Sequence, residues 1–150
     1  LPTYLSLWAK MGPFIALKFD AELPTPFTIK VGYVFPLLTT ATGRIFLAHL
    51  PNRDTDVLVR REGKIHPDML AKREAIVAGV RADGIAVSEG ALFRGFSALS
   101  APIYDHSHDL AGSVTLLGMG DQVDAMIGGT MVQQVRKTAK EISRAMGATN

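Results

Sequence analysis

The residues best suited to bind a ligand lie in a Thr-rich turn that leads into a predicted helix at residues 40–50. The first amides of a helix have no partner within the helix, and they carry the positive end of its dipole. Thr39 or Thr40 can serve as the N-cap, and Ala41, Thr42 and Gly43 are small enough for a ligand to approach those amides. The turn therefore has the features of an anion-binding site, although a capped surface helix without a ligand explains the same residues.

Other catalytic signatures are weak or missing. No serine lies in a nucleophile motif such as G-x-S-x-G, and the sequence has no phosphate loop or dinucleotide fingerprint, so no cofactor is predicted. His106 and His108 have a spacing that sometimes chelates a metal, but histidines in a polar turn are usually solvated, so we predict no metal site. Glu89 ends a predicted strand and could face a cavity, while an exposed strand-end carboxylate is the simpler explanation.

The composition indicates one folded domain over residues 1–150. Hydrophobic residues make up 47% of the chain and charged residues 20%. The absence of cysteine excludes disulfides, thiolate nucleophiles and cysteine-ligated metals, and it fits a cytoplasmic location. No apolar run approaches the length of about 20 residues that crosses a bilayer, so no membrane association is expected. The chain starts at Leu1 without a signal-peptide pattern, which indicates a fragment of a longer protein.

The net charge of +2 comes from 16 Lys and Arg against 14 Asp and Glu, which is weak for a nucleic-acid-binding domain. Basic residues form two groups on predicted helices, interspersed with acids. The groups are Arg60, Arg61 and Lys64, and Arg136, Lys137, Lys140 and Arg144. We interpret both as solvated helix faces.

The order of predicted elements favours an α+β fold. Residues 3–8 and 14–20 form a hairpin around a Gly-Pro turn, and residues 27–31 and 33–37 form one broken strand interrupted by Gly32 and Pro36. Helices follow at 40–50, 54–61 and 67–83, then strands at 85–88, 95–104 and 110–117, and a final helix at 123–146. Antiparallel hairpins bracketed by helices differ from the strand–helix alternation of a parallel nucleotide-binding fold.

Several segments in this order resemble one protein family. They are TATGRIFLAHLP at residues 40–51, GIAVSEG at 84–90, SALSAPIYD at 97–105 and LAGSVTLLG at 110–118, after the Gly-Pro hairpin. Together they resemble the C-terminal effector-binding domain of IclR-type bacterial transcription regulators, over residues 3–146. The resemblance implies a GAF-like domain, with a curved, mainly antiparallel six-stranded sheet, helices on both sides and a small-molecule pocket.

The resemblance also implies partners and a location. Family members carry an N-terminal winged helix-turn-helix DNA-binding domain, which this chain lacks, so DNA would be bound only through that domain. They assemble as homodimers or homotetramers, are usually cytoplasmic and are not enzymes. The ligand expected from the resemblance is a small organic acid.

The site residues are carried over from the family by position. Ligand-carboxylate contacts fall on the amides of Ala41 and Thr42, and the acidic strand-end position falls on Ser88, with Glu89 beside it. The pocket floor falls on Ala98, Thr115 and Leu117. Phe35, Phe93 and Phe96 lie close in sequence to the pocket segments, and they could equally be core residues. Ser88 replaces an acid and Ala98 and Leu117 replace small polar groups, so the pocket should favour a larger or aromatic acid.

Two other functions compete with the sensor. The chain could be a self-association module with a vestigial pocket, using the apolar stripe of the last helix or the exposed face of the helix at residues 68–83. It could also be an enzyme of the same fold class, in which Glu89 or His108 acts as a general acid or base.

Overall fold

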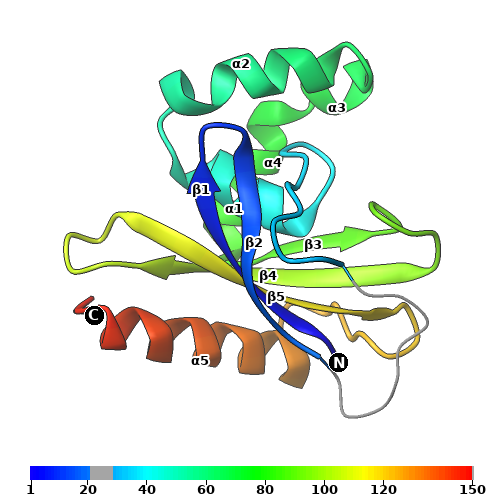
Figure 1. Ribbon diagram of the computed structural model, residues 1–150. Helices are drawn as coiled ribbons and strands as arrows, with labels where there is room; N and C mark the ends of the chain where they lie inside the picture. The colour runs from blue at the N-terminus through cyan, green and yellow to red at the C-terminus, as the bar shows by residue number, and fades with distance from the viewer. Residues whose placement is uncertain (21–28, 150) are drawn as a thin grey trace.

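The computed structural model describes residues 1–20 and 29–149. It contains one antiparallel sheet and five helices within these residues (Figure 1). The strands are β1 (Thr3–Ala9), β2 (Gly12–Phe19), β3 (Ala86–Glu89), β4 (Phe96–Tyr104) and β5 (Leu110–Met119), in the order β2-β1-β5-β4-β3. The helices are α1 (Ala41–His49), α2 (Asn52–Gly63), α3 (Pro67–Ala71), α4 (Arg73–Asp83) and α5 (Thr130–Ala145).

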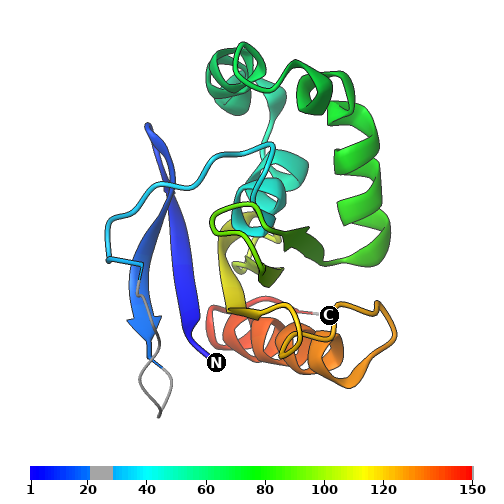
Figure 2. The ribbon, with the colours of Figure 1, turned by 90° about the vertical axis from the view of Figure 1, so that its right-hand side faces the viewer.

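The sheet separates two layers of helices. Helix α5 packs on β4 and β5 from one side, while α1 packs on the other side, contacts β2 to β5 and is backed by α4 (Figure 1). Figure 2 shows the β1–β2 hairpin running alongside α1, so the sheet curves around this helix. Helices α2 and α3 lie farther from the sheet, beyond α1. The α+β class and the curved antiparallel sheet predicted from the resemblance are therefore confirmed.

Alternation of side chains along the strands creates a core on each face of the sheet. On the α1 face, Tyr4, Ala98 and Leu117 pack with Ile45 and Ala48 of the helix. The opposite face carries a separate cluster with α5, built from Ile85, Leu99, Ile103, Val114, Val132, Val135 and Ala139. Helix α1 is apolar almost all round because α4 and a third cluster cover the surface that does not face the sheet.

The predicted sixth strand is the main correction to the fold. Positions 27 and 28 of the predicted broken strand lie outside the described residues. Its remainder pairs with β2 only through an isolated bridge between Phe14 and Val34, flanked by backbone hydrogen bonds from Ile15 to Tyr33 and from Phe35 to Pro13. Gly32 has a φ of +93°, which turns the chain away from the extended conformation needed for a regular ladder. The described residues therefore form a five-stranded sheet.

Two helix boundaries also differ from the prediction. The single helix predicted at residues 67–83 is two helices, because Lys72 has φ −95° and ψ 6° and interrupts the regular helix between α3 and α4. The last helix starts at Thr130 instead of near residue 123, with Gly129 in an extended conformation as its N-cap. Gly128 and Gly129 thus end the preceding loop, and they do not lie inside the helix.

Candidate functional site

The turn before α1 is capped by Thr40. Its side-chain oxygen accepts a hydrogen bond of 2.9 Å from the Gly43 amide and donates one of 2.7 Å to the carbonyl of Pro36. Its backbone is extended, as in most N-cap residues. Among the residues that the structure describes, no acceptor is bonded to the amides of Ala41 and Thr42, the first two residues of the helix. The start of α1 therefore presents two unused donors together with the positive end of the helix dipole.

Other amides of the same turn are occupied by the protein itself. The carboxylate of Glu62, near the end of α2, accepts hydrogen bonds of 2.9 Å from the amides of Leu37 and Leu38, one on each oxygen. This bidentate contact fixes the chain that enters α1. It also occupies two donors of the turn, whereas the amides of Thr39 and Thr40, like those of Ala41 and Thr42, have no acceptor bonded to them among the described residues. No local pattern in the sequence indicates this role of Glu62, because the two segments are far apart in the chain.

A short chain of buried hydroxyls joins α1 to the sheet. The Thr42 hydroxyl lies 2.6 Å from that of Thr115 on β5, which in turn donates to Ser100 on β4 at 2.9 Å. A hydroxyl has one proton, so with Thr115 donating to Ser100, Thr42 must donate to Thr115. Thr42 then has no side-chain proton left for a ligand. Its backbone amide is the group that can bind a carboxylate.

The structure brings most of the predicted site residues together. Phe35, Ala41, Ala98 and Leu117 belong to one buried apolar cluster, and the half-buried Phe96 packs against it. Ser88, Ala98 and Leu117 pair across β3, β4 and β5, so they form one row on the sheet. Thr42 and Thr115 are joined by the hydroxyl chain.

Glu89 does not belong to the apolar cluster, but it shares a separate hollow with Ser88, another predicted site residue. It is exposed at the end of β3 and lines, with Ser88, Thr39 and Arg44, a hollow of about 470 Å³ outside the apolar cluster. His108 lies in the turn after β4, while Glu89 pairs with Ser97 near the start of that strand. At about 3.4 Å per residue, the two side chains are more than 20 Å apart along the strand and cannot act on one substrate atom.

Arg44 holds the back of α1 in place. Its guanidinium donates to the carbonyl of Leu38 at 2.9 Å and to that of Val87 on β3 at 3.3 Å, and it contacts the sulfur of Met69. No carboxylate lies within ion-pair distance of it in the described part of the chain. Burial lowers the pKa of Arg44 from its ordinary value. Because its donors satisfy protein carbonyls, we assign Arg44 a structural role.

A hollow of about 490 Å³ opens beside the apolar cluster, and Phe93 is the one lining residue that the sequence places near the pocket segments. It is lined by Ile29, Lys30, Tyr33, Leu92 and Phe93. Ile29 is buried in the same cluster as Ala41 and Ala98, and Leu92 packs against it. Burial raises the pKa of Tyr33, so this phenol stays protonated at neutral pH. The hollow has apolar and aromatic walls with one lysine at its rim.

The two turn histidines do not form part of a larger ligand set. Within residues 1–20 and 29–149, no group of three or more His, Cys, Asp or Glu side chains is arranged to hold a metal ion. His108 has a φ of 60°, and its Nε2 lies 3.3 Å from the Thr149 hydroxyl.

None of the described helices has the length and apolar composition that a bilayer span requires.

Comparison with known proteins identifies the family. Residues 18–144 match the family model described as the C-terminal domain of the bacterial transcriptional regulator IclR. The structure superimposes on Pseudomonas aeruginosa HmgR with a TM-score of 0.89, 30% identity and coverage of 99% of this chain and 60% of that one. No curated protein sequence matches the chain significantly.

More distant structures share the fold. Thermotoga maritima IclR has a TM-score of 0.79 and 19% identity, with coverage of 97% of this chain and 61% of that chain. The Agobacterium tumefaciens repressor BlcR also has a TM-score of 0.79 and 19% identity, with coverage of 99% and 61%. This chain thus spans about 60% of the length of these proteins. From the family match and the fold, we conclude that the chain belongs to the IclR family of bacterial transcriptional regulators and corresponds to their C-terminal effector-binding domain.

Proposed function

We propose that this domain senses a small organic acid for a cytoplasmic DNA-binding transcription regulator. The ligand carboxylate binds the amides of Ala41 and Thr42. The observation that carries this proposal is that these two amides, the first of α1, have no acceptor bonded to them among the described residues. The neighbouring amides of Leu37, Leu38 and Gly43 are all bonded to protein side chains. A carboxylate oxygen is the acceptor that a helix start favours most, since it meets both the N–H groups and the dipole.

The body of the acid lies against the apolar cluster. Phe35, Phe96, Ala98 and Leu117 supply apolar contacts, while Ser88 and Thr115 are the polar groups nearest to them on the sheet. The hollow between Tyr33 and Phe93 has room for an aromatic or branched body beside this cluster. These walls favour an acid with a sizeable apolar part over a very small polar one.

The acid acts through a population shift. It stabilises whichever arrangement of a homodimer or homotetramer binds it better, and the arrangement alters DNA binding by a domain outside this chain. Glu62 connects the anion site to α2, and the hydroxyl chain from Thr42 to Ser100 connects it to the sheet. Binding at the start of α1 can therefore change the position of α1 relative to both.

A thermal-shift screen tests the anion site. Acetate, succinate, benzoate and phenylacetate are added at millimolar concentration, and we expect benzoate or phenylacetate to raise the unfolding midpoint, because a ligand that binds only the folded state stabilises it. Ala41→Pro removes one amide proton at the first helical position, where proline fits and where the extended Thr40 tolerates a following proline. It should abolish the shift.

Thr130→Pro is the matched control, because Thr130 is the first residue of α5 and also follows an extended N-cap. It should leave the shift intact. If none of the four acids stabilises the protein, or if Ala41→Pro stays folded and shows an unchanged shift, the carboxylate site is wrong.

Self-association without a ligand is a second candidate, favoured by exposed apolar residues on the edge hairpin. Leu17 and Phe19 on β2 are 53% and 61% exposed. The stripe of α5 is less suitable, because Val135 and Ala139 are buried against the sheet. Light scattering on Leu17→Lys distinguishes the two functions. Loss of oligomers together with a total lack of response to acids would favour the assembly module.

A further inference from the structure

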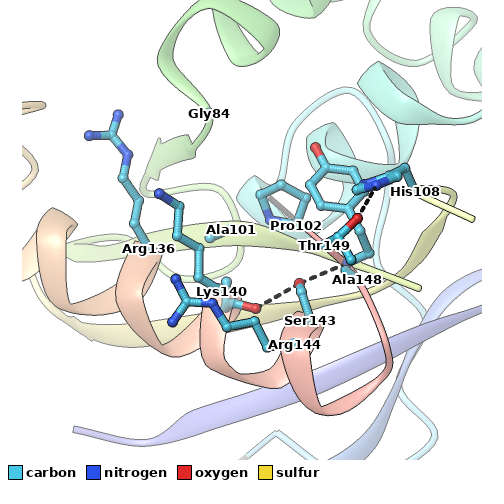
Figure 3. Close-up of a pocket in the computed structure, with 12 residues that line it drawn as sticks. Gly84, Ala101, Pro102, His108, Arg136, Lys140, Ser143, Arg144, Ala148 and Thr149 are labelled. Carbon is cyan, nitrogen blue, oxygen red and sulfur yellow. Dashed lines mark hydrogen bonds between the residues drawn. The ribbon is translucent and has the colours of Figure 1, made fainter. Parts of the chain in front are cut away.

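We propose that the domain has a second binding site, separate from α1, for a small organic polyanion: an apolar body with two or more phosphate or carboxylate groups. The site is a hollow of about 380 Å³ between α5, the end of β4 and the end of α4, here called the basic groove (Figure 3). It is lined by Gly84, Ala101, Pro102, Tyr104, His108, Arg136, Ala139, Lys140, Ser143, Arg144, Ala148 and Thr149.

Three cations follow one side of the basic groove. Arg136, Lys140 and Arg144 are spaced four residues apart on α5, so they lie on one face with a rise of about 6 Å between neighbours. In Figure 3 they extend along the helix, while Pro102 and His108 lie across the hollow. Within the part of the chain that the structure describes, no acidic side chain lines the groove.

These cations have no carboxylate partner among the described residues. Arg136 donates to the backbone carbonyl of Asp83. Like charges four residues apart on a helix repel one another and destabilise it. From the sequence alone, the basic residues of α5 are interpreted as a solvated face. Lys137 fits that interpretation, but the other three border a hollow, where a bound polyanion would relieve their mutual repulsion.

The floor of the basic groove can hold an apolar body. Ala101 and Ala139 are buried beneath it, and the ring of Pro102 and the half-buried phenol of Tyr104 form its far wall. Burial raises the pKa of Tyr104, so the phenol remains a neutral hydrogen-bond donor at neutral pH.

The ends of the groove are fixed by contacts across it. The Ser143 hydroxyl accepts from the Tyr104 amide at 2.9 Å and donates to the carbonyl of Ala139, which ties α5 to β4. The His108 ring lies 3.3 Å from the Thr149 hydroxyl at the opposite end from Arg136. A pocket with tethered walls and one row of cations is a preorganised anion site, whereas freely solvated lysines would lack such walls.

The test is calorimetric titration of the 150-residue chain at low salt with two probes. Benzene-1,3,5-tricarboxylate represents a carboxylate source and ATP a phosphate source, and benzoate is the singly charged comparison. We expect at least one of the two polyanions to bind at least tenfold more tightly than benzoate. Raising the salt concentration should weaken that binding.

Matched variants locate the binding. Lys140→Gln should weaken the polyanion about fivefold and the double variant Lys140→Gln/Arg144→Gln about 25-fold, if each exposed ion pair contributes near the top of the usual range. Lys137→Gln removes the same charge from the same helix outside the groove, and it should change affinity less than twofold. Circular dichroism confirms that each variant is folded.

Several results would overturn the proposal. One is that neither polyanion binds. Another is that Lys140→Gln and Lys137→Gln reduce the polyanion affinity equally. A third is that the chain binds a random-sequence DNA duplex but neither of the two polyanions. The Ala41→Pro variant keeps this test distinct from that of the acid sensor, because it should abolish the response to benzoate or phenylacetate and leave polyanion affinity unchanged. Loss of polyanion binding in Ala41→Pro would place the anion at α1 and also overturn the second site.

Discussion

The carboxylate of Glu62 accepts a 2.9 Å hydrogen bond from the amide of Leu37, 25 positions earlier in the chain, and its other oxygen accepts from the next amide. One side chain of α2 thus holds the turn that positions the start of α1. Any movement of α2 would be transmitted to the amides of Ala41 and Thr42 through this contact.

Glu62→Gln should therefore weaken both the fold and acid binding. The amide nitrogen of glutamine cannot accept a hydrogen bond, so one of the two turn amides loses its partner and the charge is lost. We expect a loss of about 1.5 kcal/mol in the free energy of unfolding. Urea denaturation measures it. Glu141→Gln, an exposed change on α5, is the control, and an equal loss in both variants would contradict the assigned role.

Gly43→Ala should be strongly destabilising because α1 lies directly against the preceding turn. A Cβ at this position would lie 1.8 Å from the carbonyl oxygen of Pro36 and 2.7 Å from the Cα of Leu37, and both are backbone atoms. We expect a loss of about 3 kcal/mol or failure to fold.

Gly79→Ala is the matched substitution for this comparison. Gly79 lies in α4 with open space around its Cβ position, so alanine should stabilise the protein by about 0.5 kcal/mol through helix propensity. Denaturation curves of the two variants should shift in opposite directions. Similar stability of both variants would show that the close approach of α1 to Pro36 is wrong.

The chain of hydroxyls predicts that substitution of Thr115 lowers the free energy of unfolding more than substitution of Thr42. Thr42→Val removes a donor and leaves Thr115 with its bond to Ser100, so we expect a cost of about 1 kcal/mol. Thr115→Val leaves both Thr42 and Ser100 without this partner, which should cost about 2 kcal/mol. Acid binding should survive Thr42→Val, because the backbone amide remains. Loss of the thermal shift in a folded Thr42→Val variant would mean that the hydroxyl binds the ligand.

His49 should make the fold sensitive to mild acid. Burial, and secondarily the charge of Arg81, lower the pKa of His49 below its ordinary value of 6.5. Its Nε2 is buried and has no partner among the described residues, so protonation would create an unpaired buried charge. A histidine with a lowered pKa contributes full stability above pH 6.5, and this contribution is lost as the pH falls toward the folded-state pKa.

The measurement is the unfolding midpoint between pH 7.5 and 5.5. In the native chain the ring centroids of His49 and Tyr104 are 5.7 Å apart, and His49→Phe keeps an aromatic ring at this place. The unfolding midpoint of this variant should fall less between pH 7.5 and 5.5 than that of the native chain. His66→Gln, at an exposed position, should behave like the native chain. Parallel pH profiles for all three proteins would exclude His49 as the source.

Sequence reasoning worked where the determining residues are neighbours in the chain. The Thr40 cap and the small residues after it form a local signal, and the structure has the helix start at Ala41. The hairpins followed from alternation and turn residues in the same way. The alternation of apolar with small or polar residues at 110–117 likewise predicted the strand that the structure has as β5, Leu110–Met119.

The contacts of Glu62 and Arg44 could not be predicted in this way. They join segments more than 20 positions apart, and a single charged residue on a helix has no local pattern that names its partner. The isolated bridge at Val34 follows the positive φ of Gly32, whereas no residue pattern around Lys72 indicates the break between α3 and α4. The assembly of Phe35, Ala41, Ala98 and Leu117 in one cluster agrees with the positions carried over from the family. Their role in ligand binding stays a prediction.

Pro102 has a consequence for the tendency of the protein to aggregate. β3 pairs with residues 97–100 of β4, so no strand of the described residues pairs with that edge from Ala101 to Tyr104, where the Tyr104 amide is bonded to the Ser143 hydroxyl instead. Such an edge can recruit a strand from another molecule and begin fibril-like stacking. Pro102 has no N–H to offer an incoming strand, so it acts as a gatekeeper against aggregation at the place where the sheet is left open.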